Sequence, residues 1–296
     1  MSGSRYFVIF VDDFSRYTWV FLMKSCSELL DIYRTFAKMV ETQFSKHIKA
    51  FHSDNALEYT QNDFQAILKH YGTVPHLSCP GTSQQNGCAE CKLRHILDIV
   101  RALLLSTFLP TPFWGEATIT AVYTINRLPT PILDNCTPYK SLFGSVPSYH
   151  HLRVFGSACF VLLQPYERTK LEHRSRLCCF LGYGVEQKGY RCYDPVSRHL
   201  RISRHVVFWE HRLFHKVGKF NMPYFPPFTT LLEIPLSPTP TSNVLLESTS
   251  PEQQSFDALD VVSLASLGSV PSEDPICTPP HNLHRSTRVR SLPSHL

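Results

Sequence analysis

Asp54 and Glu90 are the two residues whose type and setting best suit metal-dependent chemistry. Asp54 lies in the tripeptide Ser53-Asp54-Asn55, directly after the apolar run Ile48–Phe51, and Glu90 opens an apolar-periodic helix. Two carboxylates held at the end of a strand and the start of a helix can share a hard cation such as Mg²⁺. A pair of such ions ~4 Å apart can activate a water or a 3′-hydroxyl against a phosphodiester. The alternative is that Asp54 is a turn residue and Glu90 a carboxylate favoured by the helix dipole.

The elements expected around these carboxylates alternate between strands and helices. Residues 5–11 and 17–23 are rich in β-branched and aromatic residues, and Asp12 to Arg16 between them has turn composition, which predicts a hairpin. Apolar spacing then predicts helices or short strands over 29–44, 48–51, 62–71, 74–77, 90–104 and 113–127. This alternation indicates an α/β fold in which helices flank a mixed sheet.

The sequence changes in character after about residue 150. Short β-rich runs punctuated by Gly and Pro predict a small antiparallel barrel, with strands near 154–156, 159–163, 178–183, 190–193 and 205–208. Residues 215–296 hold 12 of the 22 prolines, with many Ser and Thr, which predicts a disordered linker. The expected organisation therefore has three parts, 1–145, 150–214 and 215–296.

The net charge of +5 is concentrated in the second of these parts. Residues 150–214 carry 11 Lys and Arg against 5 Asp and Glu, while the segments on either side are close to neutral. A basic segment of this kind indicates contact with phosphates. Ten cysteines without regular pairing, and no apolar run long enough to span a membrane, indicate an intracellular protein with reduced thiols that does not partner a membrane.

Several motifs resemble the Pol polyprotein of copia-type LTR retrotransposons, whose integrase is a DDE polynucleotidyl transferase. In that family the second Asp lies in Ser-Asp-Asn, the Glu follows Gln-Gln-Asn-Gly, and 35 residues separate the two, as positions 55 to 89 do here. Further matching motifs are Pro112-Phe113-Trp114-Gly115-Glu116-Ala117, Asn126-Arg127-Leu128-Pro129-Thr130, Leu152-Arg153-Val154-Phe155-Gly156 and Phe180-Leu181-Gly182-Tyr183. The resemblance implies an RNase H-like integrase core over 1–145, followed by an SH3-like barrel over 150–214.

The same resemblance implies a function, which is DNA integration. Mg²⁺ (or Mn²⁺) would support 3′-end processing and transfer of the element ends into a target DNA duplex. Asp54 and Glu90 would be the catalytic metal ligands. The candidate DNA-binding residues, chosen for their position or charge, are Arg94 one turn after Glu90, Gln84, Gln85 and Asn86 in the preceding loop, and Arg174 and Arg176 in the basic segment 150–214. The resemblance also implies a location in the nucleus. Whether the chain forms a homo-oligomer is left open by the sequence.

Three departures from the family pattern bear on activity. The family's first catalytic Asp lies on a strand upstream of the hairpin, and this chain begins at about that hairpin, so we expect a truncated core that is inactive as it stands. Asp12 and Asp13 are candidate substitutes, but they fall where the strand turns back. Ala56-Leu57 replaces Gly-Gly, and Cys91 replaces a common Arg. The alternatives are an inactive relic that at most binds nucleic acid, or an RNase H-like nuclease.

Overall fold

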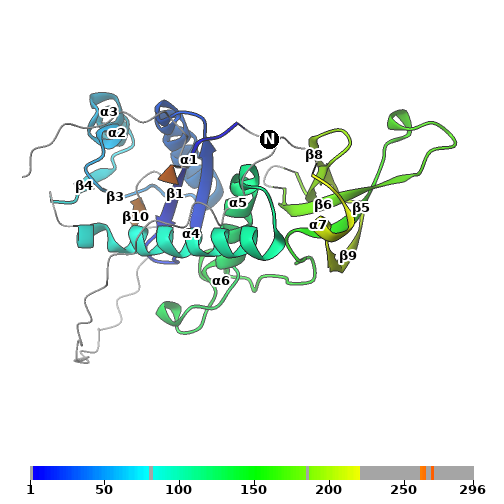
Figure 1. The fold of residues 1–296 in the computed structure, drawn as a ribbon. Coiled ribbons are helices and arrows are strands. Elements are labelled where there is room, and N and C mark those ends of the chain that lie inside the picture. Colours follow the sequence, from blue (N-terminus) through cyan, green and yellow to red (C-terminus); the bar gives the residue numbers. More distant parts are fainter. Residues whose placement is uncertain (1–2, 80–82, 185–186, 221–260, 265–267, 270–296) are drawn as a thin grey trace, which may run out of the picture.

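The computed structural model describes residues 3–79, 83–184, 187–220, 261–264 and 268–269 (Figure 1). The described chain forms two sheets and the helices that pack on them. The strands of the first sheet come mainly from the first 80 residues, and those of the second from residues 157–213. The long helix α4 (Gly87–Thr107) runs from the first sheet to the second (Figure 1).

The first sheet is mixed, as expected. Strands β1 (Tyr6–Asp12) and β2 (Thr18–Met23) form the predicted antiparallel hairpin, with Val8 opposite Phe21 and Phe10 opposite Trp19. Strands β3 (Ala50–Ser53) and β4 (Val74–Leu77) are parallel. Between β1 and β3 lies β10 (Val261–Leu264), and β11 (Gly268–Ser269) pairs with the start of β1.

The turn of the hairpin is built on Asp12, which confirms that this residue belongs to a turn. Its buried carboxylate accepts hydrogen bonds from the backbone N–H of Ser15 at 2.9 Å and from the Ser15 hydroxyl at 2.5 Å. Arg16 takes a left-handed conformation (φ +58°) and pairs with Asp13. Asx-type turns of this kind are a preferred way to reverse a chain.

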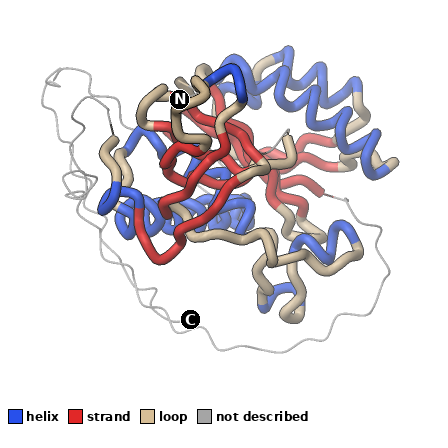
Figure 2. The backbone as a smooth tube through the Cα atoms, turned by 90° about the vertical axis from the view of Figure 1, so that its right-hand side faces the viewer, coloured by secondary structure: helices blue, strands red, loops and turns tan. Residues whose placement is uncertain are grey.

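Helices cover both faces of the first sheet (Figure 2). On one face, α1 (Leu29–Phe44) and α3 (Asn62–His70) bury a cluster of aromatic rings against Phe10 and Phe51. On the other face, α4 and α5 (Trp114–Ile125) pack against Ile9 and Val11. The remaining short helices are α2 (Leu57–Thr60), α6 (Pro138–Phe143), α7 (Phe214–Val217) and the 3₁₀ turns Cys26–Glu28, Ser83–Asn86, Thr111–Phe113, Pro131–Leu133 and Pro165–Glu167.

The second sheet contains five antiparallel strands in the order β8-β7-β6-β5-β9, as expected for the SH3-like region. Its strands are β5 (Ser157–Leu162), β6 (Ser175–Tyr183), β7 (Tyr190–Asp194), β8 (His199–Ser203) and β9 (Val206–Leu213). Two details differ from the sequence prediction: residues 154–156 form a turn, and β8 was not expected. The run His199–Ser203 alternates polar and apolar residues but contains only two apolar side chains, and it forms a strand through its pairing with β7.

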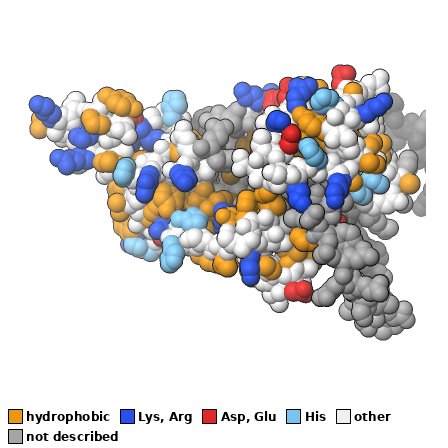
Figure 3. Space-filling model, turned by 180° about the vertical axis from the view of Figure 1, so that it is seen from behind, with side chains coloured by type: hydrophobic (Ala, Val, Ile, Leu, Met, Phe, Trp, Pro, Cys, Tyr) orange, Lys and Arg blue, Asp and Glu red, His pale blue; other side chains and the backbone are white. Residues whose placement is uncertain are grey.

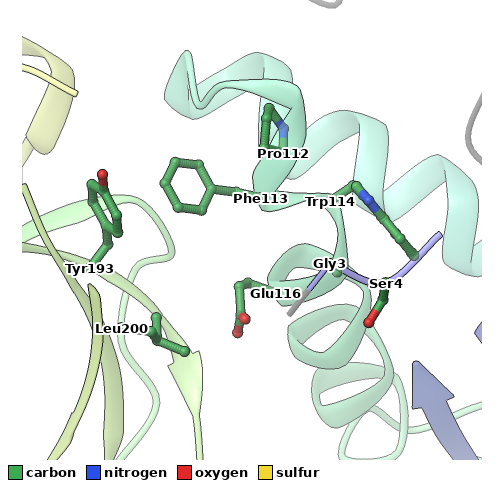
Figure 4. A pocket seen from close by; sticks show the side chains of 9 residues that line it. Gly3, Ser4, Pro112, Phe113, Trp114, Glu116, Tyr193 and Leu200 are labelled. Atoms are coloured by element: carbon green, nitrogen blue, oxygen red, sulfur yellow. The ribbon is translucent and has the colours of Figure 1, made fainter. Parts of the chain in front are cut away.

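The five-stranded sheet packs directly on α4 and α5, and one continuous core joins it to the first sheet. The threonine hydroxyl of Thr120 in α5 donates to the carbonyl of Leu181 at 3.2 Å. Next to it, Gly182 has φ +120°, and a Cβ there would lie 2.2 Å from Thr120 Oγ1. Glycine is therefore required where the strand approaches the helix so closely. Figure 4 shows Phe113 and Glu116 facing Tyr193 and Leu200 across this junction.

Most of the expected linker, residues 215–296, lies outside the described residues. At its start, helix α7 follows directly on β9 of the second sheet. Further along, β10 and β11 pair with strands of the first sheet. Local composition could not show this, because the partners of β10 lie about 200 residues earlier in the chain.

Candidate metal site at the end of β3 and the start of helix α4

Asp54 lies directly after β3 and is half-buried. One carboxylate oxygen accepts a hydrogen bond from the backbone N–H of Ala56 at 3.2 Å. Ala56 has φ −59° and ψ 146°, and Leu57 begins α2 with its side chain 78% exposed. The loop therefore accommodates Ala56-Leu57 in place of the family's Gly-Gly without a left-handed backbone conformation, so Leu57 introduces no steric cost there.

Hydrogen bonds connect the Asp54 loop to the turn that precedes Glu90. The Asn55 side-chain amide donates to the carbonyl of Ser78 at 2.6 Å, and the Ser78 hydroxyl donates to the carbonyl of Ser53 at 3.2 Å. The next backbone N–H, that of Cys79, donates to the side-chain oxygen of Gln85 at 2.7 Å. The end of β3, the end of β4 and the start of α4 are thus joined by three polar contacts.

Glu90 lies in the first turn of α4, half-buried, and Arg94 lies one turn further along and is exposed. No ion pair forms between these two side chains in the described part of the chain, although residues four apart on a helix can pair. Asn86 is the N-cap residue of α4 and is buried. Gln84 lies in the turn Ser83–Asn86, and its side chain is outside the described atoms.

Two histidines that the sequence analysis did not single out lie beside this edge. His52 of β3 and His76 of β4 are in register, and their rings stack with centroids 4.6 Å apart. Burial, followed by the proximity of His76, lowers the pKa of His52. Only the parallel pairing of two distant strands brings these rings together, and no local sequence pattern signals it.

Both candidates for a third carboxylate are engaged by neighbouring side chains of the hairpin turn. Asp12 and Phe51 both lie opposite Val262 of β10, which runs between their strands β1 and β3. Phe51 precedes Asp54 by three residues. Its carboxylate is committed to Ser15, and burial raises its pKa, while Asp13 is paired with Arg16 at 2.6 Å. Among the described residues, no three His, Cys, Asp or Glu side chains form a group that could hold a metal ion. Asp54 and Glu90 offer the hard oxygen ligands that suit Mg²⁺ or Mn²⁺.

The two basic residues selected in the second sheet have different surroundings. Arg174 is exposed at the end of the loop between β5 and β6. Arg176 is half-buried, and its guanidinium donates a hydrogen bond to the Asp194 carboxylate at 2.9 Å. The guanidinium of Arg201 donates to the same carboxylate oxygen at 2.8 Å. Burial alone would raise the pKa of Asp194, but hydrogen bonds from both guanidinium groups outweigh it and lower the pKa to about 2. Arg176 is therefore held in an internal ion pair.

Lys and Arg side chains gather at the far end of the second sheet, on the projecting loop between β5 and β6 (Figure 3). Arg168, Lys170 and Arg174 belong to this loop. No helix in the described part of the chain is long and apolar enough to cross a membrane.

Sequence comparison finds two families in this chain. The family described as "Integrase core domain" matches residues 2–83, which include Asp54, and the family described as "Retroviral polymerase SH3-like domain" matches residues 157–221. The chain is 38% identical over 294 residues to the Retrovirus-related Pol polyprotein from transposon RE2 of Arabidopsis thaliana, covering 99% of this chain and 18% of that protein. It is 40% identical over 210 residues to the Retrovirus-related Pol polyprotein from transposon TNT 1-94 of Nicotiana tabacum. This match covers 71% of this chain and 16% of that protein. The chain thus spans less than a fifth of the length of these relatives.

Solved structures with a similar arrangement are more distant. One is the simian T-cell lymphotropic virus intasome in complex with PP2A regulatory subunit B56 gamma (15% identity, TM-score 0.39, covering 71% of this chain and 72% of that one). Another is the HTLV-2 integrase catalytic core domain in complex with magnesium (18% identity, TM-score 0.35). The match covers 47% of this chain and 86% of that one.

Proposed function

This chain belongs to the Pol polyprotein family of copia-type LTR retrotransposons, with an integrase core and a retroviral SH3-like domain, and we propose that it is the DNA-joining part of such an integrase. The proposed substrates are the element ends and a target DNA duplex. Asp54 and Glu90 are the proposed catalytic metal ligands. The proposed organisation is a catalytic core over 1–145, an SH3-like region over 150–214 and a connecting segment over 215–296.

The observation that supports this proposal best is the set of hydrogen bonds between the Asp54 loop and the Gln85 turn. Asn55 and Ser78 hold the end of β3, and Gln85 receives the N–H of Cys79 just before α4 begins. These contacts fix the two segments that carry the carboxylates with respect to each other. A carboxylate pair on rigid supports binds a cation better than a pair on independent loops, because less freedom is lost on binding.

The chain's own residues would have separate tasks in the reaction. Asp54 and Glu90 would hold a divalent ion, which when bound stabilises charge on the phosphodiester. Arg94, exposed and unpaired with Glu90 in the described part, would bind a phosphate oxygen of the DNA. Gln84, Gln85 and Asn86 would line the path of the DNA at the start of α4.

Metal binding by the two carboxylates can be measured without any DNA. We expect Mn²⁺, titrated against the full chain and followed by electron paramagnetic resonance, to bind at one site. Asp54→Asn and Glu90→Gln should each weaken this binding at least about tenfold, since each removes a charged ligand. Glu172→Gln, an exposed carboxylate in the β5–β6 loop, is the matched control and should leave binding unchanged. Equal Mn²⁺ affinity in all four proteins would rule out the proposed metal site.

The second candidate function, a relic that binds nucleic acid without catalysis, is favoured by the basic loop between β5 and β6. We expect the full chain to bind duplex DNA without sequence preference, with affinity falling ~0.9 log units per log unit of salt for each phosphate neutralised. Arg174→Glu should weaken binding and reduce this slope. Arg101→Glu, on the exposed side of α4, is the control. Fluorescence anisotropy at several salt concentrations measures both the DNA affinity and its dependence on salt. The absence of DNA binding at low salt would contradict the proposal.

A further inference from the structure

A pocket beside the start of α4 contains two cysteines that the proposed function does not use. Its volume is about 490 Å³, and residues 128–132, which follow α5, line it opposite the helix. Two thiols and three basic side chains also line this pocket: Cys88, Cys91, Arg16, Lys92 and His95. The pocket thus brings sulfur atoms that can be oxidised together with groups that attract anions.

The two cysteines are three residues apart on α4, a spacing that a disulfide can bridge. In an α-helix, the Cα atoms of residues i and i+3 are about 5 Å apart. Disulfides join cysteines whose Cα atoms are roughly 4.4 to 6.8 Å apart. A bond between Cys88 and Cys91 is therefore possible without unwinding the helix. A structural zinc site would need further ligands, and the described residues offer no group of three.

The two thiols differ in exposure, which gives them different tasks. Cys91 is exposed, so a reagent in solution can reach its sulfur. Cys88 is half-buried, and a guanidinium nitrogen of Arg16 donates a hydrogen bond to its sulfur. Burial raises the pKa of the Cys88 thiol, and the charge of Arg16 opposes this rise only in part. Because the thiolate is the reactive form, Cys91 reacts first and Cys88 second.

We propose that Cys88 and Cys91 form a thiol–disulfide exchange site for small disulfides that carry carboxylates, such as glutathione disulfide. The thiolate of Cys91 attacks one sulfur of the reagent, which releases a first thiol and leaves a mixed disulfide on Cys91. The sulfur of Cys88 then attacks the sulfur of Cys91, their bond forms, and a second thiol leaves. The protein loses two electrons and two protons, and the two released thiols carry both.

The basic side chains of the pocket favour an anionic reagent. Arg16 and Lys92 are both half-buried, so salt screens their attraction for a carboxylate less than it would at an open surface. Arg16 is already paired with Asp13, so Lys92 supplies the larger share of this attraction. Burial lowers the pKa of Lys92, and a carboxylate bound beside it would favour its charged form.

Oxidation at this site would also affect the candidate metal site, a step that rests on the proposed function. Glu90 lies between the two cysteines, so the new bond closes a ring through its backbone. The bond also withdraws the Cys88 sulfur from Arg16, a contact that joins the start of α4 to the hairpin turn. Metal ligands tolerate only small displacements, so the carboxylate of Glu90 would hold a cation less well.

Mass spectrometry of the full chain after treatment with glutathione disulfide tests the exchange site. We expect a bond between Cys88 and Cys91 in the parent and in Cys79→Ser, the control that removes another exposed thiol. Cys88→Ser should stop at the mixed disulfide on Cys91, and Cys91→Ser should form neither product. Cleavage after Glu90 separates the two cysteines and locates the bond. Glutathione that stays on Cys91 in the parent, or a bond lost in Cys79→Ser, would overturn the proposal.

The preference for an anionic reagent is tested with Lys92→Gln. This variant should react several-fold more slowly than the parent with glutathione disulfide, but not with cystamine, a cationic disulfide. Equal slowing with both reagents would refute the role of charge.

Mn²⁺ binding separates this proposal from the proposed function. Binding should weaken at least about tenfold when the parent is oxidised and recover when a thiol reductant is added. The double variant Cys88→Ser with Cys91→Ser should bind Mn²⁺ equally under both conditions. A disulfide that forms without weakening Mn²⁺ binding would overturn the control of the metal site. Failure of the reduced parent to bind Mn²⁺ would instead overturn the proposed function, while the mass measurements still decide the exchange site.

Discussion

Strand transfer by a form of this chain extended at its N-terminus with an Asp-bearing strand should fall by about three orders of magnitude when Glu90 is replaced by Gln. The reason is that carboxylates in a two-metal site act as a unit, so removing one disables the others. The chain as printed should show no transfer above background. Asp12 is committed to its turn and Asp13 to Arg16, so neither is available as a third carboxylate beside Asp54 and Glu90.

The assay compares joining of labelled element-end DNA to a target duplex, in Mg²⁺ and in Mn²⁺, by the printed chain, the extended chain and its Glu90→Gln variant. Glu172→Gln in the extended chain should retain full activity, because this carboxylate lies in the β5–β6 loop. Turnover by the printed chain that Glu90→Gln abolishes would mean that another described carboxylate, with Asp13 first, completes the site. Activity of the extended chain that survives Glu90→Gln would refute the role of Glu90.

The local elements of the first sheet were predictable because each is encoded by neighbouring residues. The hairpin of β1 and β2 follows from two β-rich runs around Asp12. Helix α3 ends at His70, and Gly72, with φ +69°, follows its C-cap residue Tyr71. The apolar spacing of α1 was also informative, although the buried face includes Tyr33 and Ala37, while Ile32 and Met39 are only partly buried. A spacing of 3.6 residues per turn defines a face only to within one neighbouring position.

Contacts between distant segments could not be predicted in this way. Arg176 was selected as a DNA ligand on its charge, yet Asp194, 18 residues away, holds it in an ion pair. The stacking of His52 on His76 and the insertion of β10 likewise depend on which strands become neighbours. Pairing partners in a sheet are set by the whole fold, so a pattern read from one segment cannot supply them.

The ion pair between α5 and β7 should be the largest single polar contribution to holding the two sheets together. The guanidinium of Arg191 donates two hydrogen bonds to Glu116, at 2.6 and 2.7 Å, and only 17% and 10% of these side chains is exposed. Figure 4 shows Glu116 directed toward the second sheet at this junction. Removing one partner leaves the other charge buried and unpaired, so Arg191→Ala should lower the free energy of unfolding by about 3 to 5 kcal/mol.

Urea denaturation followed by circular dichroism measures this loss. Arg101→Ala is the control, because Arg101 pairs with Asp98 on the exposed side of α4 and its removal should cost less than about 1 kcal/mol. The double variant Glu116→Ala with Arg191→Ala should be less destabilised than the sum of the two single variants, since no charge is left unpaired. If the single losses simply add, the two side chains do not interact, and the apolar core around α5 must hold the second sheet in place without them.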